Sequence, residues 1–264
     1  MNSWIAVSRS EHATKHWRPR AGYEFAAAQQ VVPVLVAELA KLVPHYALGF
    51  MLDEDETCQF VALLGLGGSR NLFVTHDHQW LCSYVPATLR AFPFALHNDS
   101  DGNKVFCISE AHLSDDINQP PLFNDAGELD KLSADSLNFI TQCEQSRQMT
   151  IQACAALKGA GVIEPWPISI NREGQEPLVI NGLFRISETA LSNLDADTFA
   201  SLRTAGALAI AYAQILSMAQ LEQLTQRAEY LAKAQKPVNP VDALGGLFGD
   251  EDAGTLNFDS LQDD

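Results

Sequence analysis

Basic residues are scarce in this sequence. The 264 residues include 17 Lys and Arg against 33 Asp and Glu, which gives a formal net charge of −16, and no three basic residues occur in a row. Proteins that bind nucleic acid draw much of their affinity from clustered positive charge that neutralises phosphates. We therefore expect no nucleic-acid partner.

Cysteine is also sparse, and its spacing excludes two common roles. The five cysteines are odd in number, dispersed, and include no Cys-x-x-Cys pair, so neither a zinc ribbon nor a redox couple is indicated. The first 20 residues carry scattered charges and lack the apolar core of a secretory signal. Both features favour a cytoplasmic protein with reduced thiols.

Long hydrophobic runs are nearly absent. The one uncharged stretch of interest, Thr204 to Leu221, has 18 residues, the lower length limit for a membrane span. It is rich in alanine and contains Gln214, Ser217 and Gln220, and polar groups are unfavourable in a lipid core. The stretch therefore predicts a buried helix, and we expect no membrane span.

Catalytic sequence motifs are missing as well. The sequence contains no HExxH, no P-loop and no GxSxG. The Gly-x-Gly-Gly of residues 65–68 lies between two apparent strands, whereas a phosphate-binding glycine loop lies between a strand and a helix. We therefore name no catalytic residue, expect no cofactor, and consider enzymatic activity uncertain but less favoured.

The apolar pattern that is present predicts an α+β fold. Pro33 precedes a helical apolar run that Pro44 ends. Short turns separate three apolar runs, 46–52, 59–66 and 71–76. This spacing predicts an antiparallel meander, and residues 71–84 then form a hairpin.

The second half of the sequence repeats this mixture of strands and helices. Residues 104–109 read as the return strand after a turn at 99–103, and 163–170 pairs with 178–186. Helices are predicted from Ser133 or Ala134 to Lys158, after Ser187 as N-cap, and from Asp197 to Lys233. The expected domain, residues 1–236, is an antiparallel sheet built from hairpins and packed with several helices, including a long C-terminal helix.

Residues 237–264 differ sharply in composition from the rest. They contain seven acidic residues and no basic ones, so we predict a disordered tail. Two short apolar clusters interrupt it, Leu244, Leu247 and Phe248, then Leu256, Phe258 and Leu261. The tail is either a solubilising segment or a partner-binding one that orders in a groove.

Two arginines and three aromatic residues are candidate ligand-binding residues. Arg90 lies among aromatics and prolines, and Arg185 lies inside an apolar strand pattern. A charge in such a setting needs a carboxylate partner, from a salt bridge or from a ligand. Trp80, Tyr84 and Phe92 could line a peptide groove or belong to the core.

His76 and His78 are weak metal-ligand candidates. They flank Asp77, and residues two apart in an extended chain point to the same side. Imidazole is a common metal ligand, but nothing in the sequence links these two to a third ligand. A solvated turn is the favoured interpretation, and we expect no metal.

The order of several motifs resembles the SapC-like family of bacterial proteins. These motifs are VVPVLVAELAKLVPHYALGF from Val31, FVALLGLGGSRNLFV from Phe60 with Trp80 after it, YVPATLRAFPFAL from Tyr84, LFNDAGE from Leu122 and INGLFRISETALSNL from Ile180. The resemblance extends over most of residues 2–230. Thr75 to Gln79 fill the place of a short turn that is acidic and glycine-containing in the family.

The resemblance implies functions of several kinds. Members are labelled surface-layer proteins or peptide-transport permeases, and many accompany halogenase-like and oxygenase-like enzymes. Our leading hypothesis is an accessory protein that binds a peptide or protein partner and has no chemistry of its own. A homo-oligomer is compatible with this hypothesis. One alternative is a metal-dependent, oxygenase-like enzyme with non-haem iron and dispersed ligands. Another is a surface-layer or peptide-transport-associated protein.

Overall fold

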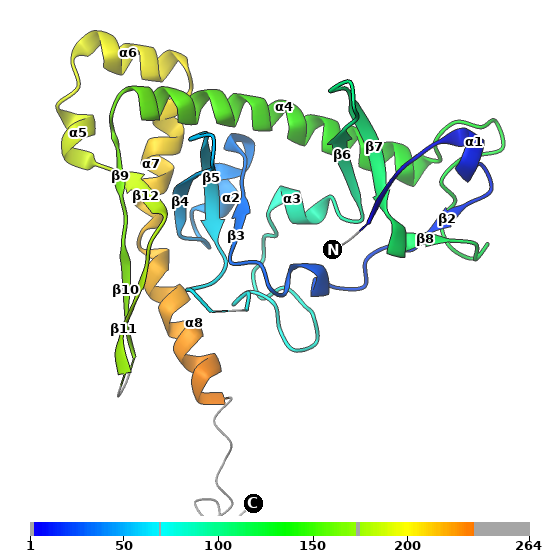
Figure 1. Ribbon diagram of the computed structural model, residues 1–264, viewed down its shortest axis with the longest axis horizontal. Coiled ribbons are helices and arrows are strands. Elements are labelled where there is room, and N and C mark those ends of the chain that lie inside the picture. Colours follow the sequence, from blue (N-terminus) through cyan, green and yellow to red (C-terminus); the bar gives the residue numbers. More distant parts are fainter. Residues whose placement is uncertain (1–2, 69, 173–174, 235–264) are drawn as a thin grey trace, which may run out of the picture. The chain divides into compact units, whose positions relative to one another are not determined.

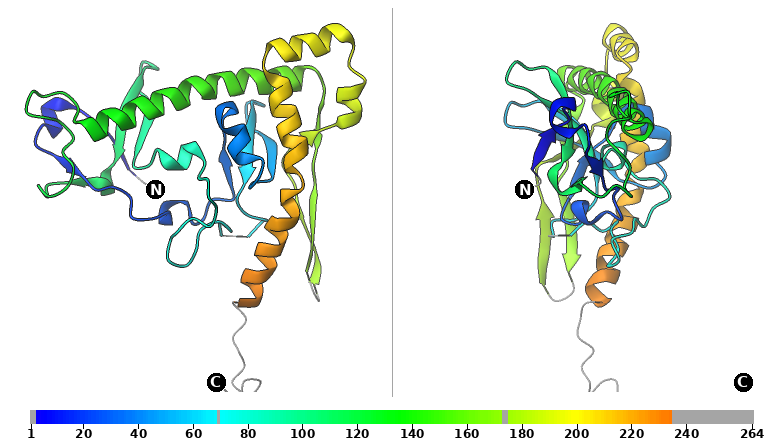
Figure 2. Two further views of the ribbon diagram at one scale, coloured as in Figure 1. Left: turned by 180° about the vertical axis from the view of Figure 1, so that it is seen from behind. Right: turned by 90° about the vertical axis from the view of Figure 1, so that its right-hand side faces the viewer.

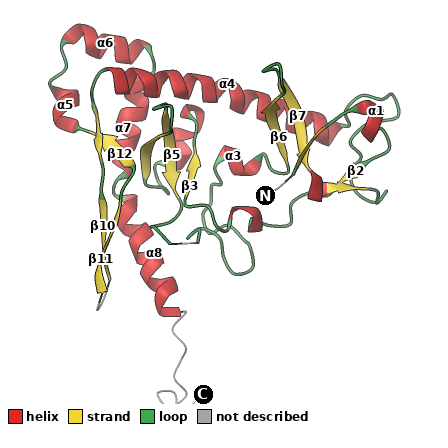
Figure 3. Cartoon of the chain, viewed as in Figure 1, coloured by secondary structure: helices red, strands yellow, loops and turns green. Residues whose placement is uncertain are grey.

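Helices and several antiparallel sheets make up the chain, which confirms the predicted α+β class (Figures 1 and 3). The computed structural model describes residues 3–68, 70–172 and 175–234. The chain divides into a first unit of residues 1–225 and a second of residues 226–264. The expected domain end at residue 236 stays a prediction.

A five-stranded antiparallel sheet joins distant parts of the first unit. Its order is β3 (Val31–Pro33), β5 (Cys58–Leu63), β4 (Leu48–Leu52), β12 (Leu183–Ile186) and β9 (Ile163–Pro165). The β4–β5 hairpin confirms the first two strands of the predicted meander. Pairing of β9 with β12, and of β10 (Ile168–Arg172) with β11 (Gln175–Ile180), confirms the strand pair predicted for residues 163–170 and 178–186.

The predicted third strand of the meander, residues 71–76, is wrong. The segment is a loop, and the expected hairpin of 71–84 is reduced to one isolated bridge between Val74 and Trp80. Both sides of β5 are already occupied, by β3 and β4. The apolar run therefore has no free edge of β5 to join, and Phe73 and Val74 are buried in a loop conformation instead.

A second antiparallel sheet has three strands. Its order is β1 (Trp4–Ala6), β7 (Lys104–Ser109) and β6 (Phe94–Asn98), and the predicted turn at 99–103 connects β6 to β7. Two-stranded sheets pair β2 (His16–Trp17) with β8 (Leu113–Ser114), and β10 (Ile168–Arg172) with β11 (Gln175–Ile180). In the described part of the chain, β3 and β6 are end strands of their sheets.

Helix α4 (Lys131–Gly159) is the longest helix, and it contacts β5 of one sheet and β6 of the other (Figures 1 and 2). Asp130 caps its first turn by accepting the Leu132 amide at 3.3 Å. Gly161, with φ of 68°, follows its end. The helix predicted to end at Lys158 is thus confirmed.

The predicted single helix of residues 197–233 is wrong. Three helices replace it, α6 (Ala196–Thr204), α7 (Ala207–Ser217) and α8 (Gln220–Ala234). Gly206 separates α6 from α7 with φ of 70°, a left-handed conformation that no helix interior contains, and the two helices meet at 92°. The long helix of the fold is therefore the central α4.

Among the described residues, no single helix is both long enough and apolar enough to cross a membrane. Only α6 and α7 taken together have the necessary length and composition, and they are bent at the break between them. The predicted buried helix corresponds to α7, whose inner face buries Ile210, Ala211 and Gln214. Its outer face leaves Tyr212 and Leu216 exposed.

The remaining helices are short. The helix expected after Pro33 is limited to a 3-10 turn and one α-turn, because Pro33 itself ends β3. A helix does begin after Ser187, as predicted, although the Ser187 side chain makes no capping hydrogen bond. These elements are α1 (Arg9–His12), η1 (Glu24–Ala26), η2 (Val36–Glu38), α2 (Leu39–Leu42), α3 (Ala87–Arg90), η3 (Glu110–His112) and α5 (Glu188–Ser192).

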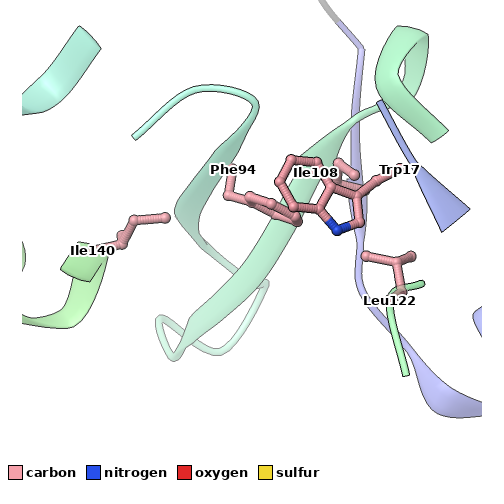
Figure 4. Packing of buried hydrophobic residues seen from close by; sticks show 5 residues of the cluster. All are labelled: Trp17, Phe94, Ile108, Leu122 and Ile140. Atoms are coloured by element: carbon pink, nitrogen blue, oxygen red, sulfur yellow. The ribbon is translucent and has the colours of Figure 1, made fainter. Parts of the chain in front are cut away.

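One buried cluster attaches β6 to α4. It consists of Trp17, Phe94, Ile108, Leu122 and Ile140, which come from β2, β6, β7, a loop and α4 (Figure 4). The Trp17 and Phe94 rings meet edge to face, with centroids 4.8 Å apart, a favoured aromatic geometry. This packing fixes the position of β6 relative to the long helix.

Candidate functional site: a groove between strands β3 and β6

Arg90 and Tyr84, two of the predicted ligand-binding residues, lie in contact. The Arg90 Nη2 donates to the Tyr84 hydroxyl at 3.1 Å. The guanidinium also lies over the rings of Tyr84 and Phe139, 5.1 and 5.0 Å from their centroids. Cation–π contact and one hydrogen bond therefore hold this exposed arginine against α4.

A buried carboxyl group, Glu38, organises the segment that contains them. Its exposed fraction is 5%. Glu38 Oε2 accepts the Tyr84 hydroxyl and the Ala87 amide, both at 2.8 Å, and Oε1 accepts the Leu35 amide at 3.0 Å. Burial, followed by the hydrogen bond to Glu38, raises the pKa of Tyr84 to about 12. Tyr84 therefore links the Arg90 guanidinium to the Glu38 carboxyl group.

Trp80 belongs to the same hydrogen-bonded network. Its indole N–H donates to the Tyr46 hydroxyl at 2.9 Å, and that hydroxyl donates to the Tyr84 main-chain carbonyl. Its ring also stacks on Phe73, with centroids 5.8 Å apart. Trp80 is thus used to hold the loop that carries Tyr84.

Phe92, two residues after Arg90 in the chain, packs among aromatic rings. It stacks on Phe25 with a centroid distance of 4.0 Å, and it meets Trp4 edge to face at 6.3 Å. The Arg20 guanidinium donates to the main-chain carbonyls of Arg90 and Phe92 at 2.9 and 3.0 Å. The segment after α3 is therefore fixed from both sides.

Arg185 does not join this group. It lies on β12, and its Nε donates to Glu164 on β9 at 2.9 Å. Hydrogen bonds from Ser187, and then from Arg185, lower the pKa of the half-buried Glu164 carboxyl. The arginine thus has a structural partner within its own sheet.

His76 and His78 lie at the tip of the loop after residue 74. The His76 side chain is 99% exposed and lies 3.4 Å from Asp77, and His78 has φ of 59°. Over residues 3–68, 70–172 and 175–234, no three His, Cys, Asp or Glu side chains gather in a way that could hold a metal ion. The metal-dependent alternative stays an untested prediction.

A groove of about 750 Å³ opens between the end strands of the two larger sheets. Residues 31–33 of β3 form one side and residues 94–98 of β6 form the other, while α3 and α4 contribute further walls. Figure 1 shows α3 between β3 and β6, with α4 passing above them. Phe92 also lines the groove, so one of the predicted residues lies in it.

One end of the groove is charged. Arg147 donates two hydrogen bonds to Glu144, at 2.6 and 2.7 Å, and the Lys104 ammonium lies 3.5 Å from the same carboxylate. The bonds from Arg147 hold the pKa of Glu144 down at about 2. Two cations therefore share one ionised carboxylate, which leaves one positive charge in excess.

Sequence reasoning missed Glu38 and the charged end of the groove. Glu144 and Arg147 are three residues apart in a helical stretch, a spacing that indicates a surface ion pair without indicating a groove. Glu38 lies in an apolar run, and the sequence does not show which hydrogen-bond donors would stabilise a buried carboxyl group there. The predicted tail residues Leu244, Leu247, Phe248, Leu256, Phe258 and Leu261 lie outside the described residues.

Comparison with known proteins identifies the family. The family model described as SapC matches residues 7–224. No curated protein and no solved structure matches the chain. The match covers nearly all of the first unit, including every strand of both larger sheets except β1, which ends one residue before the match begins. This chain belongs to the SapC family.

Proposed function

We propose that this SapC family protein is an accessory factor that binds a peptide or protein partner in the groove between β3 and β6 and performs no chemistry of its own. The groove itself is the observation that supports this proposal. Its volume, about 750 Å³, falls within the ~300–1,000 Å³ typical of binding clefts. Apolar walls and a few polar groups, as here, are also usual for such sites.

We also propose that the protein binds its partner in the cytoplasm. Cys58, Cys107, Cys143 and Cys154 are free thiols, which supports a reducing compartment such as the cytoplasm. The family's halogenase-like and oxygenase-like companions make an enzyme of that kind the first partner to test.

Site-directed photo-crosslinking tests the proposal. A benzophenone side chain replaces Thr88, an exposed residue on the α3 wall of the groove. The control variant carries it at Met149, which is 54% exposed on α4 and does not line the groove. Irradiation in an extract of the producing organism should give one discrete crosslinked species from position 88 and none from position 149. Equal capture at both positions would contradict the proposal.

Deletion of residues 237–264 tests the tail separately. If the tail contributes to binding, the shortened chain should recover less of the species crosslinked at position 88. Unchanged recovery would show that the groove acts without the tail.

A further inference from the structure

The outer edge of β6 presents unpaired main-chain groups to the groove. In an antiparallel pair, alternate residues direct both N–H and C=O toward the neighbouring strand. The Ser109 amide on β7 donates to the Pro93 carbonyl at 2.9 Å, and the register continues without a shift through β6. Odd-numbered residues therefore face β7, while Leu96 and Asn98 face the groove, where no described residue bonds their main chain.

The opposite edge, on β3, is closed by its sequence. Its outward positions are Val31 and Pro33, because the neighbouring Val34 amide donates to β5. Proline has no N–H, and the Pro33 carbonyl already accepts the Thr88 hydroxyl at 2.9 Å. Prolines at strand edges commonly prevent pairing with a further strand. Only β6 can therefore accept an added strand along this groove.

Charge indicates the kind of strand that fits. The charged residues that line the groove are Lys104, Glu144 and Arg147, so cations outnumber acids there two to one. Over the whole chain the acids outnumber the cations, and the net charge is −16. A positive groove end on a strongly acidic protein complements a negatively charged segment and disfavours a basic one.

We infer that the groove binds an extended, acidic segment of a partner protein, which adds as a fourth strand to the outer edge of β6. Main-chain hydrogen bonds to Leu96 and Asn98 would supply affinity, as in other strand-addition complexes. Acidic side chains at one end would meet Lys104 and Arg147. The inference rests on the proposed function and specifies the chemistry of its partner.

Amide hydrogen exchange of the full, ¹⁵N-labelled chain tests the geometry. The probe is the peptide Ser-Val-Asp-Val-Glu-Val-Ser at saturating concentration. The Leu96 and Asn98 amides should exchange at least about tenfold more slowly with peptide bound, which corresponds to ~1.4 kcal/mol. The Val31 amide, on the closed edge, should not change. Protection of Val31 alone, or of neither edge, would overturn the inference.

Charge variants test the chemistry. Lys104→Gln and Arg147→Gln should each weaken binding of this peptide about fivefold at low salt, a loss typical of one partly exposed charge pair. The matched control is Lys158→Gln, which removes one charge from the same helix at a residue paired with Glu56 outside the groove. The Asn/Gln counterpart of the peptide should bind equally to all four proteins. Equal losses in the control, or no preference for the acidic peptide, would refute the acidic segment.

Other occupants give distinguishable results. If Leu96 and Asn98 are protected in the free chain, and deletion of residues 237–264 removes that protection, then the chain's own acidic segment is the occupant and the partner assignment is wrong. Protection that rises with protein concentration would indicate a second copy and would equally refute it. If peptide binding fails while crosslinking from position 88 persists, strand addition fails and the proposed function stands. If both fail, the proposed function falls as well.

Discussion

Replacement of Glu38 by Ala should destabilise the fold by about 4 kcal/mol. The carboxyl group accepts three hydrogen bonds in a site that is 5% exposed. The Tyr84 hydroxyl can turn toward another acceptor, but the Leu35 and Ala87 amides are fixed. Each buried donor left without an acceptor costs about 1–3 kcal/mol, so two cost about 4 kcal/mol. For a chain of this size, that lowers Tm by about 8–16 °C.

The conservative variant Glu38→Gln gives a graded test of the same reasoning. A carboxamide keeps the shape and one acceptor oxygen, but its NH₂ group must face one of the two amides. One donor is then left unsatisfied, and the expected loss is about 2 kcal/mol. The exposed control Glu54→Ala should stay within ~0.5 kcal/mol of wild type.

Urea unfolding followed by tryptophan fluorescence measures these differences, with the dependence on denaturant unchanged among variants. The Ala87 amide belongs to α3, so Glu38→Ala should also reduce crosslinking from position 88 in the groove wall. A loss below 1 kcal/mol for Glu38→Ala, or equal losses for both variants, would refute the assigned hydrogen bonds.

Three further predictions concern other residues. The pKa of Tyr84 is raised from 10.0 to about 12, so its contribution to stability is complete below pH 10 and is lost as pH rises from 10 through 12. Tyr84→Phe should flatten the decline of unfolding free energy in that window, and an identical decline in both proteins would contradict the shift. Joint replacement of His76 and His78 by Asn should change stability by less than ~0.5 kcal/mol and leave partner capture unaltered; a large loss of either would show that these residues bind a ligand. Gly206→Ala should cost about 1 kcal/mol or more because φ is 70° there, whereas Gly159→Ala, at a helical position with open space around it, should be neutral or stabilising in the same melting experiment.

Local patterns in the sequence predicted the elements whose cause is local. Gly161 follows the end of helix α4, and the β6–β7 hairpin has a turn of Asp, Ser, Gly and Asn. Such signals depend only on neighbouring residues, so they can be recognised in the sequence without knowledge of the fold. The bend at Gly206 was missed because the apolar spacing of the stretch continues on both sides of the glycine, although glycine was the available warning.

The strand prediction for residues 71–76 was wrong for a different reason. Their apolar run satisfies a strand pattern, but a strand also needs a free neighbour, and β5 already has two. The second neighbour is β3, whose residues Val31 to Pro33 read in the sequence as the approach to a helix. Hydrophobic periodicity predicts which side chains will be buried, but it does not predict which strand of a sheet a segment will pair with.

The candidate site shows the same division between local and distant causes. Arg90 and Tyr84 lie within one short segment, and their side chains contact each other, so a local sequence pattern was enough to group them. The groove was not predictable, because its two sides come from different sheets that are set apart by α3 and α4.

Pro33 illustrates what the sequence contains and what only the fold interprets. In the sequence it indicated a helix start, since proline suits a first helical turn. In the structure it ends an edge strand, and at one of the two outward positions of that strand it leaves no N–H to pair across the groove. The β6 edge, with Leu96 and Asn98 in the equivalent outward positions, has no such block. Because the β3 edge is closed and the β6 edge is open, an added strand could pair only with β6 in this groove. A Pro33 variant that restores the N–H should therefore add a second protected edge without weakening the first.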